Sequence, residues 1–265
     1  MEQHSLNDDE YSKQTIFAVV SSFVTLVGYY IPGCFFVLAD KYRFLDAYAI
    51  RSGKHRVPPQ KLTLAAIKEA TLDTFIVKPL LFYFLFPLFE TTLSFGEFPS
   101  VSVGFTQWII MEVSFSITFY IAHRLLHNSP FLYKHIHKVH HTFHESIGFA
   151  GQYSHPVENV MGGLHLLIAV LIVRPHVTVF WINLFTRYVE IVDAHSGYEV
   201  PWRVVYPWAS CYPWACGASV HDFHHSHNRG AYGGGILSVD KLLGTDQDYR
   251  DFLLKKKTRI GQELR

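Results

Sequence analysis

The chain has 265 residues, of which 49% are hydrophobic, 16% are aromatic and only 17% are charged. This charged share lies below the roughly 25% of an ordinary soluble domain and favours a protein that is partly solvated by lipid. The formal net charge of +1 gives no reason to expect a nucleic-acid partner. Histidine is the outlier at 17 copies, whereas the cysteines are too few and too scattered for a disulfide framework or a thiolate metal site. They are Cys34, Cys211 and Cys216.

The N-terminal part of the chain predicts a first membrane span. Its opening residues are acidic where a cleavable secretory signal would be basic, so no such signal is expected. The run Thr15–Ala39 has no charged side chain and exceeds the roughly 20 apolar residues that cross a bilayer as a helix. Pro32 and Gly33 predict a kink near its end. The basic segment Asp40–Lys68 follows, and Pro58 with the next proline interrupts any helix there.

Two further apolar runs predict the second and third spans. The run Phe75–Phe95 contains Lys78 and Glu90, which lie near its ends, where long side chains can extend to the headgroups. The run Phe105–Ala122 carries a single charge at Glu112. Because an acidic side chain is costly in lipid, we expect this carboxylate to face protein.

A fourth membrane element is predicted from two shorter runs, Val160–Val173 and Val177–Val192, separated by residues 174–176. Each is short for a full crossing, so the pair indicates a hairpin that returns to the side it left. One long, kinked crossing is the alternative. The sequence therefore predicts an all-α integral membrane protein with about four transmembrane or hairpin segments and a helical cap.

The distribution of basic residues predicts the orientation. The segment Asp40–Lys68 holds seven Lys and Arg, whereas the loop around Glu97 has none. By the positive-inside rule the first is cytosolic and the second is not. The N-terminus then lies on the far side, and every histidine cluster, together with Lys255–Lys257, lies on the cytosolic face.

The histidines form three clusters that predict metal binding. The first pair has HxxxH spacing, and the other two clusters have HxxHH spacing, which brings residues four apart onto one helix face. Residues 128–130, Asn-Ser-Pro, should end one helix before the second cluster begins. Eight imidazoles exceed what one metal accepts, so two metals are predicted. The eight are His123, His127, His137, His140, His141, His221, His224 and His225.

Other residues near the clusters are candidates for additional roles. His195 is the best candidate for a ninth ligand. Metal-bound imidazoles need acceptors for their other nitrogen, for which Glu145 and Glu158 are near in sequence. The glycine-rich stretch 230–235 predicts a flexible turn near the site, because no Lys-Ser/Thr follows it as in a phosphate loop. The remaining candidates for an outer position or for ligation are His144, His155, Asp193 and Asp222.

Ligand type alone leaves the metal open, because all-nitrogen sites accept iron, copper, zinc or nickel. A thiolate-free, redox-competent site at a membrane favours iron that activates dioxygen. A membrane zinc hydrolase is an alternative of a different class, but no HExxH is present to supply a general base. A metal transporter is another, although its sites should lie near the middle of the membrane and not at the ends of spans.

The clusters, in this order, resemble the sterol desaturase/fatty acid hydroxylase superfamily of membrane di-iron enzymes. Other stretches look like its C4-methylsterol oxidase branch, and the likeness runs from about Glu112 to Asp246, about half of the chain. The stretches are His123–His127, Tyr133–His141, Tyr153–Pro156, Asp193–Tyr198 with Pro201-Trp202, and Leu243–Asp246.

The resemblance implies a membrane oxygenase in which histidines hold two Fe ions and no protein nucleophile or general base is needed. It implies O2 as oxidant, electrons from NAD(P)H through cytochrome b5 or an equivalent carrier, and an endoplasmic reticulum location with a cytosolic site. The lipid would enter from the bilayer and be hydroxylated, demethylated or desaturated. A sterol such as a 4-methylsterol is favoured, and a fatty-acyl or other lipid is the alternative.

The same resemblance divides the chain into three parts. Residues 1–104 would form the N-terminal helices with the basic loop, 105–250 the catalytic domain, and 251–265 a basic cytosolic tail. Three positions depart from the pattern of the branch and bear on substrate choice more than on ligation. Ser116 stands where relatives carry an acidic residue, Gln152 where a Glu is frequent, and Val239 where an aromatic is common.

Overall fold

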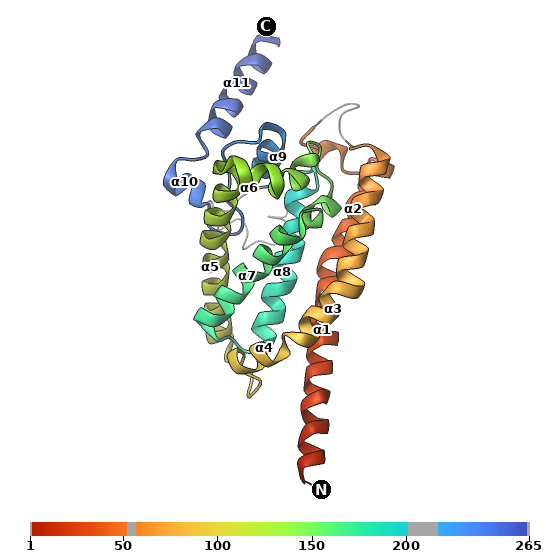
Figure 1. Ribbon diagram of the computed structural model, residues 1–265. Helices are drawn as coiled ribbons and strands as arrows, with labels where there is room; N and C mark the ends of the chain where they lie inside the picture. The colour runs from red at the N-terminus through yellow and green to blue at the C-terminus, as the bar shows by residue number, and fades with distance from the viewer. Residues whose placement is uncertain (1, 52–56, 201–216, 264–265) are drawn as a thin grey trace.

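A computed structural model of the chain describes residues 2–51, 57–200 and 217–263, and in these ranges the ordered elements are helices. Two isolated β-bridges are the only extended pairings there. The all-helical fold class is therefore confirmed (Figure 1). Cys211, Cys216 and Pro201-Trp202, which the sequence analysis singled out, lie outside the described residues.

The first predicted span is the upper part of helix α1 (Glu2–Tyr42), in which Lys13–Tyr42 is long and apolar enough to cross a membrane. Pro32, expected to kink the helix, lies inside one uninterrupted element. The end near Asp40 is fixed by the Tyr198 hydroxyl, which donates to its carboxylate at 2.8 Å. The opposite end of α1, the N-terminus, points away from the cap, as the distribution of basic residues predicted (Figure 1).

The second span differs from its predicted bounds. Helix α2 (Gln60–Leu72) begins directly after the proline pair, inside the basic segment that the sequence assigned to a loop, and continues through a π-helical turn (Asp73–Val77) into α3 (Lys78–Phe84). The chain then bends by 58° into α4 (Phe86–Thr92). Apolar composition marked the lipid-facing part of this element, but it did not mark where the helix begins or bends.

Lys78 does not extend to a headgroup, as the sequence suggested, but lies 3.5 Å from the carboxylate of Asp73. The π turn explains this contact. Its i→i+5 hydrogen bonding brings side chains five apart onto one face, where an α-helix would separate them. An ion pair inside a span reduces the cost of placing either charge in lipid.

The third span and the hairpin are present close to their predicted positions. Helix α5 (Val101–Asn128) starts at Ser100, whose hydroxyl caps it, and α6 (Pro130–His135) starts after Ser129. Helices α7 (Pro156–Val173) and α8 (Val177–His195) are joined by a turn at Arg174, which has φ of 47°.

The two helices form a hairpin and not one crossing. Glu158 near the start of α7 and His195 at the end of α8 both contact the histidine clusters. The turn between them contacts the opposite end of the molecule, where His176 bonds the Gly96 carbonyl at 3.2 Å. The alternative of a single kinked crossing is therefore excluded.

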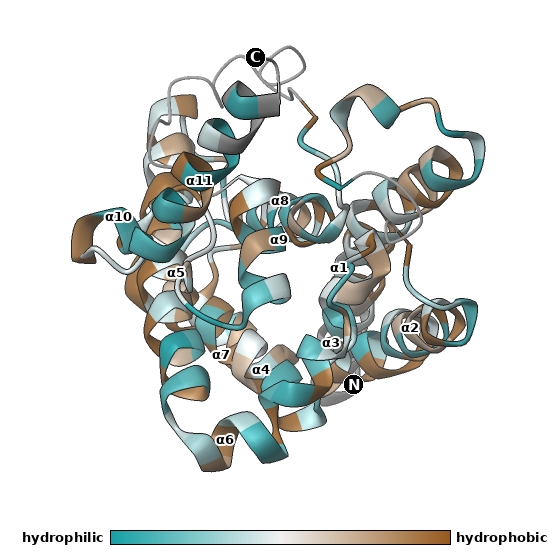
Figure 2. Cartoon of the chain, turned by 90° about the horizontal axis from the view of Figure 1, so that it is seen from above, coloured by the Kyte–Doolittle hydropathy of each residue, from teal (hydrophilic) through white to brown (hydrophobic). Residues whose placement is uncertain are grey.

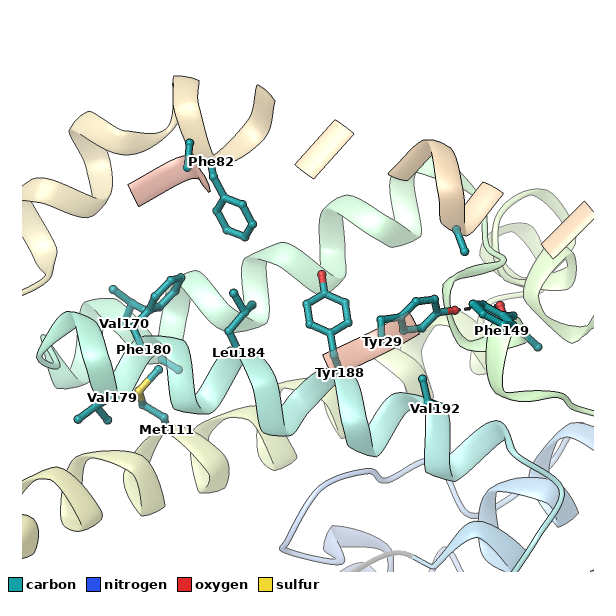
Figure 3. Close-up of a cluster of buried hydrophobic side chains, with 14 of the residues drawn as sticks. Tyr29, Phe82, Met111, Phe149, Val170, Val179, Phe180, Leu184, Tyr188 and Val192 are labelled. Atoms are coloured by element: carbon teal, nitrogen blue, oxygen red, sulfur yellow. Dashed lines mark hydrogen bonds between the residues drawn. The ribbon is translucent and has the colours of Figure 1, made fainter. Parts of the chain in front are cut away.

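Helix α8 is the centre of the fold and packs between α1 and α5 (Figure 2). The aromatic side chains Phe17, Phe89 and Phe180 interlock where α1, α4 and α8 meet. Nearer the cap, the Tyr29 hydroxyl donates to the Phe149 carbonyl at 2.9 Å, and the Tyr188 ring packs edge-on against that of Tyr29 (Figure 3). These contacts fix the ends of the spans at one height below the cap.

Glu112 faces protein, as expected, and is fully buried. Its carboxylate pairs with the guanidinium of Arg187 on α8, and it accepts a hydrogen bond from the Asn183 amide at 2.6 Å. Arg187 also pairs with Glu190. This cluster joins α5 to α8 inside the membrane-spanning part.

Replacing Glu112 with Ala should lower the free energy of unfolding by about 3 kcal/mol, because it removes one of the two carboxylates paired with the buried guanidinium and leaves the Asn183 amide without its acceptor. Reversible unfolding of the detergent-solubilised protein measures the change. The matched control is Glu97→Ala, which removes a carboxylate from an exposed loop. Equal stability of the two variants would contradict this role of the cluster.

Candidate metal centre

The predicted ligands come from four places that are distant in sequence but meet above the spans. The last two turns of α5 carry the first cluster, and α8 ends at His195. The second cluster lies on a 3₁₀ helix (His137–Thr142), not on an α-helix, and the third lies on α9 (Ala218–His227). In the described residues, all nine predicted histidines meet in two groups, within each of which the candidate ligand nitrogens lie within 4.8 Å of one another. The first group is His123, His127, His137, His141 and His224, and the second group is His140, His195, His221 and His225.

The HxxHH clusters divide between the two groups in a regular way. In the second cluster the outer histidines, four apart, join the first group and the middle one joins the second. In the third cluster the outer pair joins the second group and the middle one joins the first. Each HxxHH motif therefore serves both groups. The rings of His141 and His225 lie 4.6 Å apart between centroids, so the groups are adjacent.

The Nε2 atoms converge within each group. In the first group, Nε2 of His137 lies 3.0 Å from that of His123 and 2.9 Å from that of His127. In the second, Nε2 of His221 lies 2.9 Å from that of His195 and 3.1 Å from that of His225. Such spacings fit nitrogens that surround a common point about 2 Å from each.

In six of the nine histidines the other ring nitrogen, Nδ1, bonds an acceptor that fixes the tautomer, whereas Nδ1 of His141 is buried without a partner among the described residues. A carbonyl or carboxylate oxygen can only accept, so the proton must lie on Nδ1 and Nε2 must carry a lone pair. His137 donates to Glu158 Oε1 at 2.8 Å. The other Nδ1 donors bond backbone carbonyls, in the pairs His123–Tyr232, His140–Tyr153, His195–Ile191, His224–Gly230 and His225–Phe143.

Burial keeps these imidazoles neutral. It lowers the pKa of His140 to about 4, against the opposing effect of the Tyr153 carbonyl. Burial is also the largest cause of the lowered pKa of His221 and His224, and neighbouring imidazoles lower the pKa of both further. Neutral imidazole is the form that binds a metal.

The arrangement fits two metal ions better than it fits hydrogen bonding. Lone pairs that point at one another from 3 Å repel, and a cation between them turns this repulsion into attraction. The first group supplies five nitrogens and the second four. Structural zinc takes four ligands and catalytic zinc three, so five nitrogens favour a metal of higher coordination number.

The other candidates lie apart from the two groups. His144 is exposed, and His155 accepts from the Val157 amide as the N-cap of α7. Asp222 is paired with Arg51 through Oδ2 at 2.9 Å, and Glu145 lies 3.9 Å from the same guanidinium. Asp193 borders a cavity. Among the acidic acceptors suggested by the sequence, Glu158 bonds His137 of the first group.

Sequence reasoning missed the structural role of the glycine-rich stretch. Its carbonyls at Gly230 and Tyr232 accept from the first group, and Asp240 holds it through the amides of Tyr232 and Gly233 at 2.9 and 2.5 Å. Gly235 has φ of +81°, and a Cβ there would lie 2.6 Å from the Ser116 hydroxyl. The stretch is therefore a fitted part of the site and not only a flexible turn. The run of glycines was the sequence signal that could have revealed this close fit.

Arg51 was also missed, because the sequence showed only a basic loop. Arg51 joins this loop to Asp222 on α9. The loop is also attached to the chain just after α8, since the Ile50 amide donates to the Gly197 carbonyl at 3.0 Å. The loop thus supports α9 and the three predicted ligands on it. Helix α11 (Gln247–Glu263) projects beyond this cap (Figure 1).

A cavity of about 1500 Å³ lies directly below the histidines. Its upper end is bordered by histidines of both groups, and its walls come from α1, α3, α5, α7 and α8. Phe115, Phe119 and Leu126 line the α5 side, and Gly162 and Gly163 border it on α7. An apolar space that joins the metal-binding groups to the level of the spans can hold a lipid.

The fold and site together define a class: a membrane-spanning, all-helical protein with a two-group histidine centre above an apolar cavity. Residues 108–245, just over half of the chain, match the fatty acid hydroxylase family. The chain belongs to this family of membrane lipid oxygenases, which confirms the predicted superfamily and the oxidoreductase class.

Several characterised proteins are similar to this chain. Methylsterol monooxygenase 2-2 of Arabidopsis thaliana is 30% identical over 230 residues, which is 84% of this chain and 82% of that protein. Methylsterol monooxygenase 1 of Gallus gallus is 32% identical over 183 residues, or 69% of this chain and 59% of that protein. A very-long-chain aldehyde decarbonylase of Oryza sativa subsp. indica is 33% identical over 156 residues, or 58% and 57%. No solved structure matches the chain.

Replacing one histidine in either group should remove one metal and leave the other. We expect His224→Ala to lower the metal content of the first group and His140→Ala that of the second, so each purified variant keeps about half of the metal. Elemental analysis measures the content, and His144→Ala, an exposed neighbour, is the control. Full metal content in both variants would contradict the grouping.

Replacing Glu158 with Leu removes the acceptor of His137 Nδ1 without touching a candidate ligand. Such acceptors orient the ring and raise its basicity, and their loss costs about 10- to 100-fold in metal affinity. Titration with a competing chelator measures the affinity. An affinity equal to that of the unmodified protein would show that Glu158 does not support the centre.

Proposed function

We propose that this chain is a di-iron oxygenase that oxidises a membrane lipid, with a sterol such as a 4-methylsterol as its favoured substrate. O2 is the oxidant, and NAD(P)H supplies electrons through cytochrome b5 or an equivalent carrier. The endoplasmic reticulum membrane, with the centre facing the cytosol, is the proposed location. The observation that carries the proposal is the junction of two converging imidazole groups with an apolar cavity.

The nine histidines would hold the two Fe ions, five nitrogens at one and four at the other. When bound, the two ions would supply the redox chemistry that activates dioxygen. The protein contributes neutral nitrogen donors, held by carbonyls and by Glu158, and it keeps this geometry before the lipid arrives.

The cavity would position the lipid and exclude water. Phe119 lies against His123 with 5.0 Å between ring centroids, so the apolar wall begins directly beside the donors. A carbon placed there meets the centre in a dry environment, which limits side reactions of a strong oxidant. Entry from the bilayer suits a cavity whose walls are the membrane helices themselves.

The similarity to methylsterol monooxygenases supports the sterol, since one of them aligns over most of both chains. A long-chain aldehyde is the second candidate. It is supported by the rice aldehyde decarbonylases, whose sequence identity to this chain is as high as that of the methylsterol monooxygenases but covers a shorter stretch. Both candidates have an oxygen atom close to the reacting carbon.

The test uses the Fe(II)-loaded protein in lipid nanodiscs with a chemical reductant. A 4-methylsterol and a long-chain aldehyde are supplied separately, with and without O2, and products are identified by mass spectrometry. We expect oxidation of the sterol that requires O2 and falls at least about 100-fold in His140→Ala, because a ligand is lost. Turnover without O2 would refute the oxygenase, and reaction of the aldehyde alone would replace the sterol.

A further inference from the structure

His165, in the middle of α7, is a buried histidine that belongs to neither metal-binding group. It is 7% exposed, and its ring borders the cavity. Its Nδ1 has no hydrogen-bond partner in the described part of the chain. The ring packs edge-on against Phe115 and Phe119 of α5, at 6.1 and 6.0 Å between centroids.

The comparison with His176, another buried histidine outside the groups, shows what is unusual. Nδ1 of His176 bonds Thr178 at 2.7 Å, and its Nε2 bonds the Gly96 carbonyl. Buried polar groups are nearly always paired in this way, because an unpaired one loses its bonds to water without replacement. The surroundings of His165 are apolar, but its neutral ring has one N–H donor and one nitrogen acceptor that a ligand in the cavity could use.

The location of His165 is close to the centre. Phe119 touches both His165 and His123, with ring separations of 6.0 and 5.0 Å, so one lipid molecule can reach the imidazole and the donors together. There is room for it, since the cavity that both rings border has a volume of about 1500 Å³.

The charges around His165 indicate a neutral ligand. The guanidinium of Arg187, which also borders the cavity, lies over the Phe115 ring at 4.3 Å and is shared between Glu112 and Glu190. Two carboxylates against one guanidinium leave no cation for an anionic headgroup. On the other wall of the cavity, Lys78 is paired with Asp73. A carboxylate ligand is therefore disfavoured relative to a hydroxyl or a carbonyl.

We propose that His165 is the hydrogen-bond partner of a neutral oxygen, a hydroxyl or a carbonyl, on the lipid held in the cavity. This bond orients the lipid so that a nearby carbon lies below the histidine groups. The inference rests on the proposed function and names the residue that recognises the polar end of its substrate. A sterol hydroxyl next to the carbon to be oxidised fits this arrangement.

The central variant is His165→Phe, which keeps an aromatic ring of similar size and removes both nitrogens. Because no partner inside the protein is lost, the melting temperature should stay equal or rise. A clear fall in both this variant and His165→Leu would show a structural role and contradict the proposal. His165→Gln retains hydrogen bonding, His165→Leu is used if the phenylalanine variant fails to fold, and the exposed His135→Phe is the matched control.

Equilibrium binding of two ligand pairs to the metal-loaded protein in nanodiscs provides the main test. The pairs are a 4-methylsterol with its 3-deoxy analogue, and a long-chain alcohol with the alkane of the same length. We expect the wild type and His135→Phe to prefer the hydroxyl member of at least one pair by about fivefold or more. His165→Phe should bind both members equally, and His165→Gln should retain part of the preference.

Two results would overturn the inference: a wild type without preference in either pair, or an unchanged preference in His165→Phe. The proposed function fails separately. If the preference depends on His165 but no O2-dependent product forms from either class of lipid, the oxygenase is wrong and the recognition by His165 remains.

Discussion

The structure depends on one unfavourable arrangement, the convergence of nine neutral imidazoles whose lone pairs meet about 3 Å apart. Nothing in the groups neutralises this repulsion except a cation, and burial prevents the rings from becoming cations themselves. The protein must therefore hold the rings in place until metal arrives. It does so with backbone carbonyls and with Glu158, each of which accepts a hydrogen bond from the Nδ1–H of one ring. The tautomer, the metal preference and the rigidity of the cap follow from these acceptors.

The membrane helices provide the positions that this arrangement requires. Ligands at the ends of α5 and α8 converge only if both helices end at the same height, and the Glu112–Arg187 pair fixes these two helices to each other below the centre. The hairpin returns α8 to the cap and brings Glu158 to His137. The polar pair in lipid is costly on its own, but it sets the register on which the ligand geometry depends. The spans are therefore part of the site and not only an anchor.

Local spacing predicted much of this. Residues four apart lie on one face, so the pairs His123/His127 and His221/His225 each joined a single group, and apolar run length predicted three spans and the hairpin. Contacts between distant segments were not predictable. The Gly230 carbonyl and the Arg51–Asp222 pair depend on tertiary packing, and short-range patterns contain no information about it. The 58° bend after α3 was not predicted because it falls inside the continuous apolar run Phe75–Phe95.

Substrate choice depends on the contrast between the apolar walls of the cavity and the unpaired imidazole that borders it. The walls are apolar, so hydrophobic burial holds many lipids with little discrimination, and each additional methylene changes the binding free energy by under about 1 kcal/mol. A buried polar group discriminates far more strongly, because a ligand without the matching atom leaves it unpaired. Two cationic side chains that border the cavity, Lys78 and Arg187, are already paired with carboxylates. An unpaired imidazole beside the centre is thus the feature that can distinguish an oxygenated lipid end from a hydrocarbon, and it also determines which carbon lies nearest the two groups.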